Sequence, residues 1–220
     1  MTVIVSKPAV NLREELASLR NQGGYQEQQF YFDGLVTNGT FDSDTDWTLE
    51  NGWSISGGVL SKAAGSGNGR TATQAVNFVA GRTYIAKFDY TDQGSDIAFG
   101  YGTLSTSTGL SQNLTALSGT GAKTISVTPL FSGGFLGFRG NDSNVGQVDN
   151  LLVFEVDAND DVVHRMPKGW APKDVYEDGL LQREGAAHDY EVVYDGFDYY
   201  VKPTVAPSAT TQTCVIGVKA

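Results

Sequence analysis

The stretch RTYIAKFDYT, residues 82–91, places its side chains on two distinct faces if it is extended. The alternate positions on one face are Tyr84, Ala86, Phe88 and Tyr90. The positions between them include Lys87 and Asp89, which favour solvent. Because successive side chains of a β-strand point to opposite sides of a sheet, this pattern predicts a strand with one face in a hydrophobic core.

Short stretches of the same character occur on both sides of residues 82–91. WSISGGVLSKA, residues 53–63, predicts a hairpin about Gly57 and Gly58. Further strands are expected in KTISVTPL (123–130), GGFLGFRG (133–140) and QVDNLLVFEV (147–156). Turn residues separate these stretches and no helical pattern lies between them, which favours an antiparallel sandwich over β-α units. We therefore expect an all-β domain over residues 36–157.

The N-terminal segment, residues 1–35, contains the one expected helix. In PAVNLREELASLR, residues 8–20, Asn11 is a predicted N-cap and Glu14 completes a capping box. Leu12, Leu16 and Leu19 then form one apolar stripe. The stripe can pack on its own domain or serve oligomerisation around a symmetry axis, and the sequence leaves both open.

The C-terminal segment, residues 158–220, is expected to be a linker followed by a small β-domain. Its strongest signal is DYEVVYDGFDYYVKP, residues 189–203, where Asp195 and Gly196 separate two alternating runs. A unit this small has a limited core, so we expect it to lean on the sandwich or on sister subunits.

The composition restricts the classes of partner. A formal net charge of -10 over 220 residues repels phosphate backbones and anionic lipid, so nucleic acid is not an expected partner. The single cysteine, Cys214, excludes an internal disulfide framework. No apolar run is long enough to span a bilayer, so we expect no membrane insertion and synthesis in a cytoplasm.

Three aspartates, Asp42, Asp44 and Asp46, alternate in TFDSDTDWTLENGW, residues 40–53. An EF-hand loop would need Gly at its sixth position and Glu at its twelfth, and these places hold Trp47 and Trp53. An EF-hand is therefore not expected. Aspartates that cap turns in solvent remain one interpretation.

LVTNGTFDSDTDWTLENGWSISGGVLS, residues 35–61, resembles the opening of the carbohydrate-binding-module jelly rolls of families four and nine. VDNLLVFEV, residues 148–156, is similar to their closing strand. The resemblance implies a jelly-roll β-sandwich with Trp47 and Trp53 in its core. It also implies a structural calcium ion held by Asp42 and Asp149, although the family commonly has Glu in place of Asp42. No other cofactor is expected.

Glycan binding requires exposed aromatic rings beside planar polar groups. The candidates are Tyr90, Phe99, Tyr101, Phe138, Arg139 and Asn141. An aromatic residue on an alternating strand can instead belong to the core, and this alternative stays open.

Both ends of the chain resemble virion proteins of tailed bacteriophages. MTVIVSKPAVNLREELASLR, residues 1–20, resembles their N-terminal leaders, and residues 175–219 resemble short C-terminal β-units of fibre and surface proteins. This resemblance implies assembly and display on the particle surface, in contact with other capsid or tail proteins. A homotrimer is expected, because short β-units and the Leu-striped helix gain burial when they are repeated about an axis. The expected function is that of a non-enzymatic structural protein, displayed as a fibre, tail appendage or head decoration, that contacts cell-surface polysaccharide.

Two other functions remain open. One is a lectin-like glycan-binding module with no role in a particle, and the other is a capsid cement protein with no ligand. An enzyme is not expected, because His164 and His188 lie in polar stretches with no nucleophile elbow beside them. GSGNGR, residues 65–70, lacks the Lys-Ser/Thr of a phosphate loop and is interpreted as a flexible hairpin loop.

Overall fold

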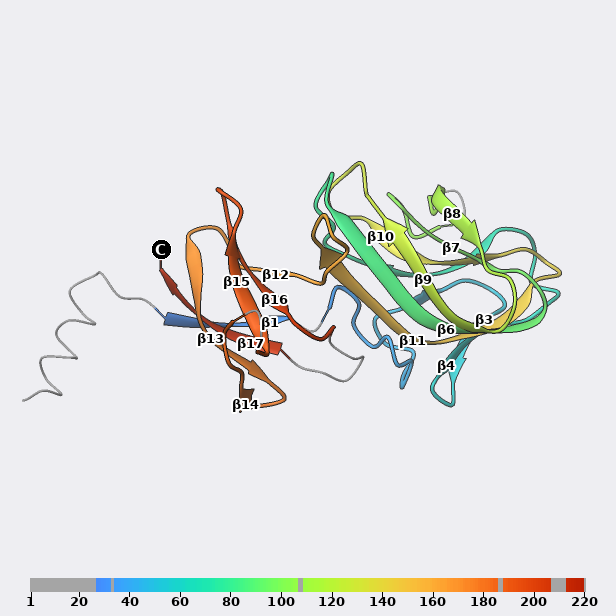
Figure 1. Ribbon diagram of the computed structural model, residues 1–220. Helices are drawn as coiled ribbons and strands as arrows, with labels where there is room; N and C mark the ends of the chain where they lie inside the picture. Colours follow the sequence, from blue (N-terminus) through green and yellow to red (C-terminus); the bar gives the residue numbers. More distant parts are fainter. Residues whose placement is uncertain (1–26, 33, 107–108, 186–187, 207–212, 220) are drawn as a thin grey trace, which may run out of the picture. The chain divides into compact units, whose positions relative to one another are not determined.

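The computed structural model describes residues 27–32, 34–106, 109–185, 188–206 and 213–219. These residues form strands and no helix, which confirms the all-β fold class (Figure 1). Consequently, none of the described residues belongs to a helix that could cross a membrane. The predicted helix with Leu12, Leu16 and Leu19 lies outside the described residues.

The described strands divide into two compact units. The larger unit contains β2 to β11, and the smaller unit combines β1 with β12 to β17. Each unit has its own cluster of buried apolar side chains. Residues 33–163 of the larger unit are continuous in sequence, whereas the smaller unit draws strands from both sides of them.

The larger unit contains two five-stranded antiparallel sheets. One sheet has the order β2 (Thr48–Leu49), β5 (Arg70–Ala75), β10 (Phe135–Gly140), β7 (Ala98–Gly102) and β8 (Gln112–Ala116). The other has the order β3 (Trp53–Ser56), β4 (Val59–Lys62), β11 (Val145–Val156), β6 (Thr83–Ser95) and β9 (Gly121–Val127). Most successive strands alternate between the sheets, as in a jelly roll, and the exceptions are the two pairs of consecutive strands β3–β4 and β7–β8, each of which stays within one sheet.

Aromatic side chains from both sheets fill the space between them. The ring of Phe138 on β10 lies 5.3 Å from the ring of Phe88 on β6 and 5.3 Å from the ring of Phe99 on β7. The alternation predicted from residues 82–91 is confirmed, since Tyr84, Ala86, Phe88 and Tyr90 are all buried. Trp47 and Trp53 are also buried, as the resemblance implied.

The smaller unit contains two antiparallel sheets. The first has the order β1 (Glu27–Phe32), β17 (Thr213–Lys219), β13 (Trp170–Glu177) and β14 (Leu180–Leu181). The second has the order β12 (His164–Arg165), β16 (Tyr199–Pro203) and β15 (Tyr190–Tyr194). Their shared core contains Met166, Val175, Tyr190, Val201 and Val215.

The pairing of strand β1 changes the predicted extent of the N-terminal segment, residues 1–35. Glu27 pairs with Val218 and Phe32 pairs with Thr213, so β1 is an edge strand of the sheet that contains β17. Residues 27–32 therefore belong with the C-terminal strands, because main-chain pairing joins segments that are far apart in sequence.

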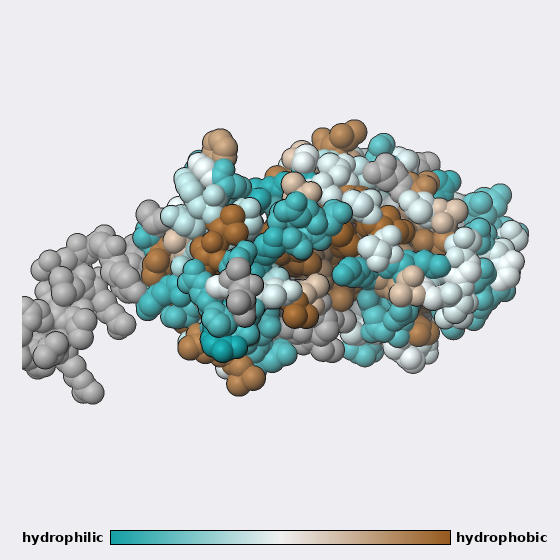
Figure 2. Space-filling view, in the orientation of Figure 1, coloured by the Kyte–Doolittle hydropathy of each residue, from teal (hydrophilic) through white to brown (hydrophobic). Residues whose placement is uncertain are grey.

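Apolar side chains also reach the surface, and the visible ones are brown in Figure 2. Leu130, Leu180, Phe197 and Val205 are among the most exposed.

Candidate functional site

The four aromatic residues predicted to bind sugar belong to the core. Tyr90 is 1% exposed, Phe99 0%, Tyr101 1% and Phe138 0%. They fill the inner faces of the two sheets because the alternate positions beside Phe99 and Tyr101 on β7 hold only alanine and glycine. The predicted stacking surface is therefore wrong for these four residues.

Arg139 and Asn141, the other two candidates, line a hollow of about 320 Å³ in the larger unit. The ends of β7, β8 and β10 surround it. Its lining also includes Asp96, Ala98, Leu114, Ala116 and Asn144. The sequence did not single these residues out, since the segments of β7 and β8 lie beside Arg139 only through the pairing of β7 with β10, which are not adjacent in the chain.

The cross-strand register explains the floor of the hollow. Arg139 on β10 pairs with Ala98 on β7 and with Thr71 on β5. Ala98 in turn pairs with Ala116 on β8. Because neighbouring strands present their paired residues on the same face, small side chains stand beside the long side chain of Arg139.

Arg139 makes no hydrogen bond or ion pair with any other residue that the structure describes. The remaining described arginines all have partners. Arg70 donates to the Ser66 carbonyl, and Arg82, Arg165 and Arg183 pair with Glu155, Asp195 and Asp189. The guanidinium of Arg139 is thus available to a ligand in the hollow.

Asn141 is held in place through one end of its amide. Its Oδ1 accepts a hydrogen bond from the Gly69 backbone N–H at 3.1 Å. Its own backbone N–H donates to Asn144 Oδ1. The Asn141 side-chain NH₂ makes no hydrogen bond to another described residue, so it remains a donor at the rim of the hollow.

The loop of residues 63–69 is fastened to the β10–β11 turn beside the hollow. Gly65 N–H donates to the Asp142 carbonyl at 2.9 Å, and Gly67 N–H donates to Asp142 Oδ1 at 2.7 Å. Asp142 N–H donates back to Asn68 Oδ1 at 3.3 Å. These contacts indicate an ordered loop, in contrast to the flexible loop expected from its glycines.

Lys62 supports the same region from inside the sandwich. It is 2% exposed, and its Nζ donates to the Ala63 carbonyl at 2.7 Å and to Ser66 Oγ at 2.5 Å. Burial lowers the pKa of Lys62, and the charge of Asp142 partly opposes that effect. A Cβ on Gly140 would lie 2.9 Å from Lys62 Cε, so a larger residue there would require the Lys62 side chain to shift.

The implied calcium ligands each make local hydrogen bonds. Thr40 Oγ1 donates to Asp42 Oδ2 at 2.7 Å, and the Asn150 backbone N–H donates to Asp149 Oδ1 at 2.7 Å. Leu151 N–H donates to the Gly39 carbonyl at 2.8 Å, so the segment before Asp42 does lie beside β11. Within the described ranges, no group of three or more His, Cys, Asp or Glu side chains is placed to hold a metal ion. Two carboxylates and nearby carbonyls could still bind calcium, and the ion stays a prediction.

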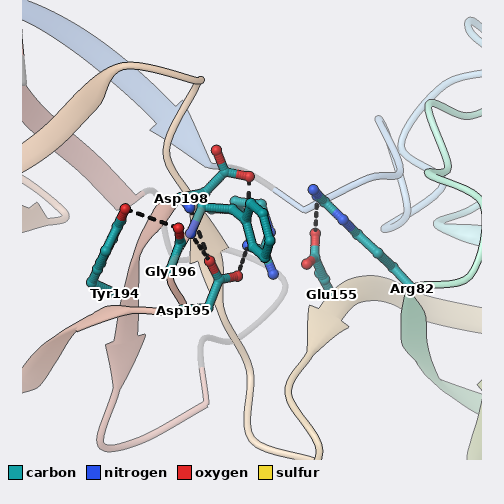
Figure 3. Close-up of polar contacts among 8 residues, drawn as sticks. Arg82, Glu155, Tyr194, Asp195, Gly196 and Asp198 are labelled. Atoms are coloured by element: carbon teal, nitrogen blue, oxygen red, sulfur yellow. Dashed lines mark hydrogen bonds and ion pairs between the residues drawn. The ribbon is translucent and has the colours of Figure 1, made fainter.

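The turn between β15 and β16 is a second distinctive surface, in the smaller unit. Asp195 Oδ1 accepts the backbone N–H groups of Phe197 and Asp198 at 2.9 Å each, and Arg165 donates to Asp195 Oδ2 at 2.6 Å (Figure 3). Tyr194 Oη donates to the Gly196 carbonyl at 3.0 Å. The turn presents Phe197, which is 87% exposed, the highest value among the large apolar residues that the structure describes.

Charge and backbone donors together stabilise the Asp195 carboxylate. Hydrogen bonds from the Asp198 backbone N–H, from the Arg165 side chain and from the Phe197 backbone N–H lower the pKa of Asp195 to about 2. Its oxygens are committed to the turn. Asp195 therefore fixes the turn and is not a ligand-binding group.

No family model matches this chain, and no curated protein matches it. Three solved structures show weak similarity. A carbohydrate-binding module of family 4 is 12% identical with a TM-score of 0.41, and the alignment covers 55% of this chain and 99% of that one. The enzymatically active domain of tailspike protein 4 from bacteriophage CBA120 is 16% identical with a TM-score of 0.40, over 56% of this chain and 21% of that one.

The adhesin domain of Epf from Streptococcus pyogenes is 10% identical with a TM-score of 0.32, over 88% of this chain and 80% of that one. All three TM-scores are low. These similarities therefore establish neither a shared family nor a shared function.

Proposed function

We propose that this protein is a non-enzymatic virion protein of a tailed bacteriophage, displayed on the particle surface, and that its sandwich binds glycans in the Arg139 hollow. The observation that carries the binding proposal is the guanidinium of Arg139, which has no partner among the described residues, in a hollow that also contains Asp96 and Asn141. These groups supply donors and acceptors for sugar hydroxyls.

The size and lining of the hollow suit a sugar unit. A volume of about 320 Å³ lies at the lower end of the range of small-molecule sites. Ala98, Ala116 and Leu114 can contact the C–H surface of a pyranose ring, while the polar groups stand around it. With no aromatic ring in the lining, affinity would come from hydrogen bonds and charge more than from stacking.

The number of carboxylates favours binding over hydrolysis. Glycosidases of the usual kind use two carboxyl groups across the scissile bond. Asp96 is the single acidic side chain that lines this hollow. His164 is 4% exposed, so it is not offered to a substrate as a general base.

Display on a particle is supported by the resemblance of both ends of the chain to phage virion proteins. The Leu12, Leu16 and Leu19 stripe would then serve attachment or a homotrimer. A trimeric mass in light scattering behind a sizing column would support this assembly, and a clean monomer would favour a stand-alone lectin-like module.

A glycan array with the full chain tests the binding proposal. We expect saturable binding of a restricted set of glycans, lost in Arg139→Ala. Lys87→Ala is the matched control, because Lys87 is exposed on β6 and its replacement also removes one positive charge. A correctly folded protein that binds nothing on the array but incorporates tightly into capsids would contradict glycan binding and support a cement protein.

A further inference from the structure

We infer that the glycan taken by the Arg139 hollow carries a carboxylate, as in a hexuronic acid unit. This inference rests on the proposed glycan-binding function and adds the chemical class of the ligand. The two statements can fail separately.

Arg139 has no negatively charged partner among the described residues. The chain has a formal net charge of -10, with Asp and Glu 25 against Lys and Arg 15. Acidic side chains are therefore abundant, yet none lies within ion-pair distance of Arg139 among the described residues. The cross-strand neighbours of Arg139 are Ala98 and Thr71, which cannot supply a negative charge.

Glu50, the acidic residue next to Thr71, does not contact Arg139 either, because it hydrogen-bonds to Thr71. Glu50 Oε2 accepts the Thr71 backbone N–H at 2.8 Å and the Thr71 hydroxyl at 3.2 Å. The same hydroxyl also lies 3.0 Å from the Ser105 carbonyl, to which it can donate instead. The groups on this side of Arg139 therefore hydrogen-bond to one another and not to its guanidinium.

Two opposite charges are held apart within the hollow. Asp96 and Arg139 both line it, but they form no ion pair. Asp96 is exposed and Arg139 is partly exposed. A ligand that offers a carboxylate to Arg139 and hydroxyl donors to Asp96 would satisfy both at once, whereas an ion pair would have closed the hollow.

The cost of removing water from the Arg139 guanidinium also favours a charged ligand. Covering the guanidinium with a neutral sugar removes water from a charge and returns only neutral acceptors. A carboxylate matches the planar fork of an arginine with two parallel hydrogen bonds, and hydrogen bonds to charged groups are about twice as strong as neutral ones. The geometry thus favours an acidic over a neutral sugar by about tenfold or more.

The acidic surface of the chain limits the kind of acidic glycan. A densely charged polyanion is repelled by a net charge of -10. Isolated carboxylates separated by neutral sugars encounter less repulsion. The expected ligand is therefore a polysaccharide with a carboxylated sugar in a mostly neutral repeat.

Titration calorimetry with a matched ligand pair tests the inference. One ligand is an oligosaccharide with a single glucuronic acid, and the other is the same oligosaccharide with that carboxyl reduced to the alcohol. We expect the acid to bind about tenfold tighter or more, and added salt to weaken it. Arg139→Gln should abolish the preference, Arg139→Lys should keep part of it, and the control Lys87→Gln should keep all of it.

The outcomes separate the two proposals. If the protein bound both ligands with equal affinity and Arg139→Gln did the same, the carboxylate inference would be overturned and glycan binding would remain intact. Binding of neither ligand, together with a silent array and an unchanged circular dichroism spectrum, would overturn glycan binding itself. Unchanged thermal midpoints in the variants exclude unfolding as the cause.

Discussion

Asp195 illustrates how one side chain can define a turn. Its carboxylate accepts the backbone N–H groups of Phe197 and Asp198 and the side chain of Arg165. The Asp-Gly signal in the sequence predicted a turn here, and β15 and β16 pair on either side of it. Arg165 could not be assigned to the turn beforehand, because it lies 30 residues away in the chain.

Arg165→Gln should raise the pKa of Asp195 from about 2 but leave it below its ordinary value of 3.8, since the backbone N–H of Asp198 is the largest cause of the shift. A lowered pKa contributes stability above about 3.8, and this contribution is lost as the pH falls toward about 2. Amide chemical shifts of Phe197 and Asp198 followed against pH would measure the change. Lys168→Gln, at an exposed position, is the control; an equal effect there would contradict a specific role of Arg165.

His164 makes the stability of the fold depend on pH in a different range. It is 4% exposed, and its desolvation by burial lowers its pKa from 6.5 to about 4. The unfolded chain therefore takes up a proton at a higher pH than the folded chain. The contribution is complete above about 6.5 and falls as the pH drops toward about 4.

Between about pH 7 and about pH 5, we expect the free energy of unfolding to decrease by about 2 kcal/mol from this residue. Urea unfolding at the two pH values would measure the decrease. His164→Phe should remove most of this pH dependence, and the exposed His188→Gln should not. An unchanged pH dependence in His164→Phe would show that another group is responsible.

At the scale of the elements, β10 depends on a close approach to β5. A Cβ on Gly137 would lie 2.0 Å from the carbonyl oxygen of Ala72, a backbone atom that cannot move independently of its strand. Gly100 on β7 is less restricted, with its nearest atoms at 3.0 Å. The two glycines therefore provide a graded pair within one sheet.

Gly137→Ala should destabilise the larger unit by about 3 kcal/mol, because the new methyl group must push two strands apart. Gly100→Ala should cost about 1 kcal/mol, since Leu114 can adjust its rotamer and the Gln112 carbonyl oxygen, also at 3.0 Å, need shift only slightly. Denaturant unfolding would give both values. Equal losses in the two variants would contradict the role of the β5–β10 contact.

The strands themselves were largely predictable, and the site was not. The alternation in residues 82–91 identified the buried face of β6, and the same reasoning would have placed Phe99 and Tyr101 in the core, because glycine and alanine occupy the other face of β7. Arg139 and Asn141 were recognised by residue type. Asp96 could not be associated with them, since only the pairing of β7 with β10 brings it to the same hollow.

At the scale of the whole molecule, the two units differ in how their cores are built. The larger core draws on β2 to β11 and contains many aromatic rings. The smaller core consists of Met166, Val175, Tyr190, Val201 and Val215, with partly buried residues such as Phe30 packed against it. Phe30 belongs to β1, so the smaller unit depends on a strand from the other side of the sandwich sequence.

A fragment of residues 34–163 should therefore fold alone, with the circular dichroism of a β-protein and a cooperative thermal transition. A fragment of residues 164–220 should not fold, because it lacks β1 and leaves one side of β17 unpaired. Adding residues 27–32 through a short linker after Lys219 should restore its folding. A stable 164–220 fragment would contradict the role of β1.

The long-range pairing of β1 with β17 was beyond the reach of the sequence. Nothing local in EQQFYF, residues 27–32, indicated that Glu27 pairs with Val218 and Phe32 with Thr213. The polar stretch after residue 157 predicted the C-terminal boundary of the sandwich, whereas the continuous part of the larger unit extends to Val163.

The way the chain enters and leaves the sandwich also bears on its evolutionary history. Residues 33–163 form one uninterrupted stretch between β1 and β12, so a single recombination event at each end would excise the sandwich as a cassette and leave the host strands intact. A different domain could occupy the same place without any change to the strands that surround the insertion. Relatives of this chain would then share the sequences around β1 and β12 to β17 while differing completely between them.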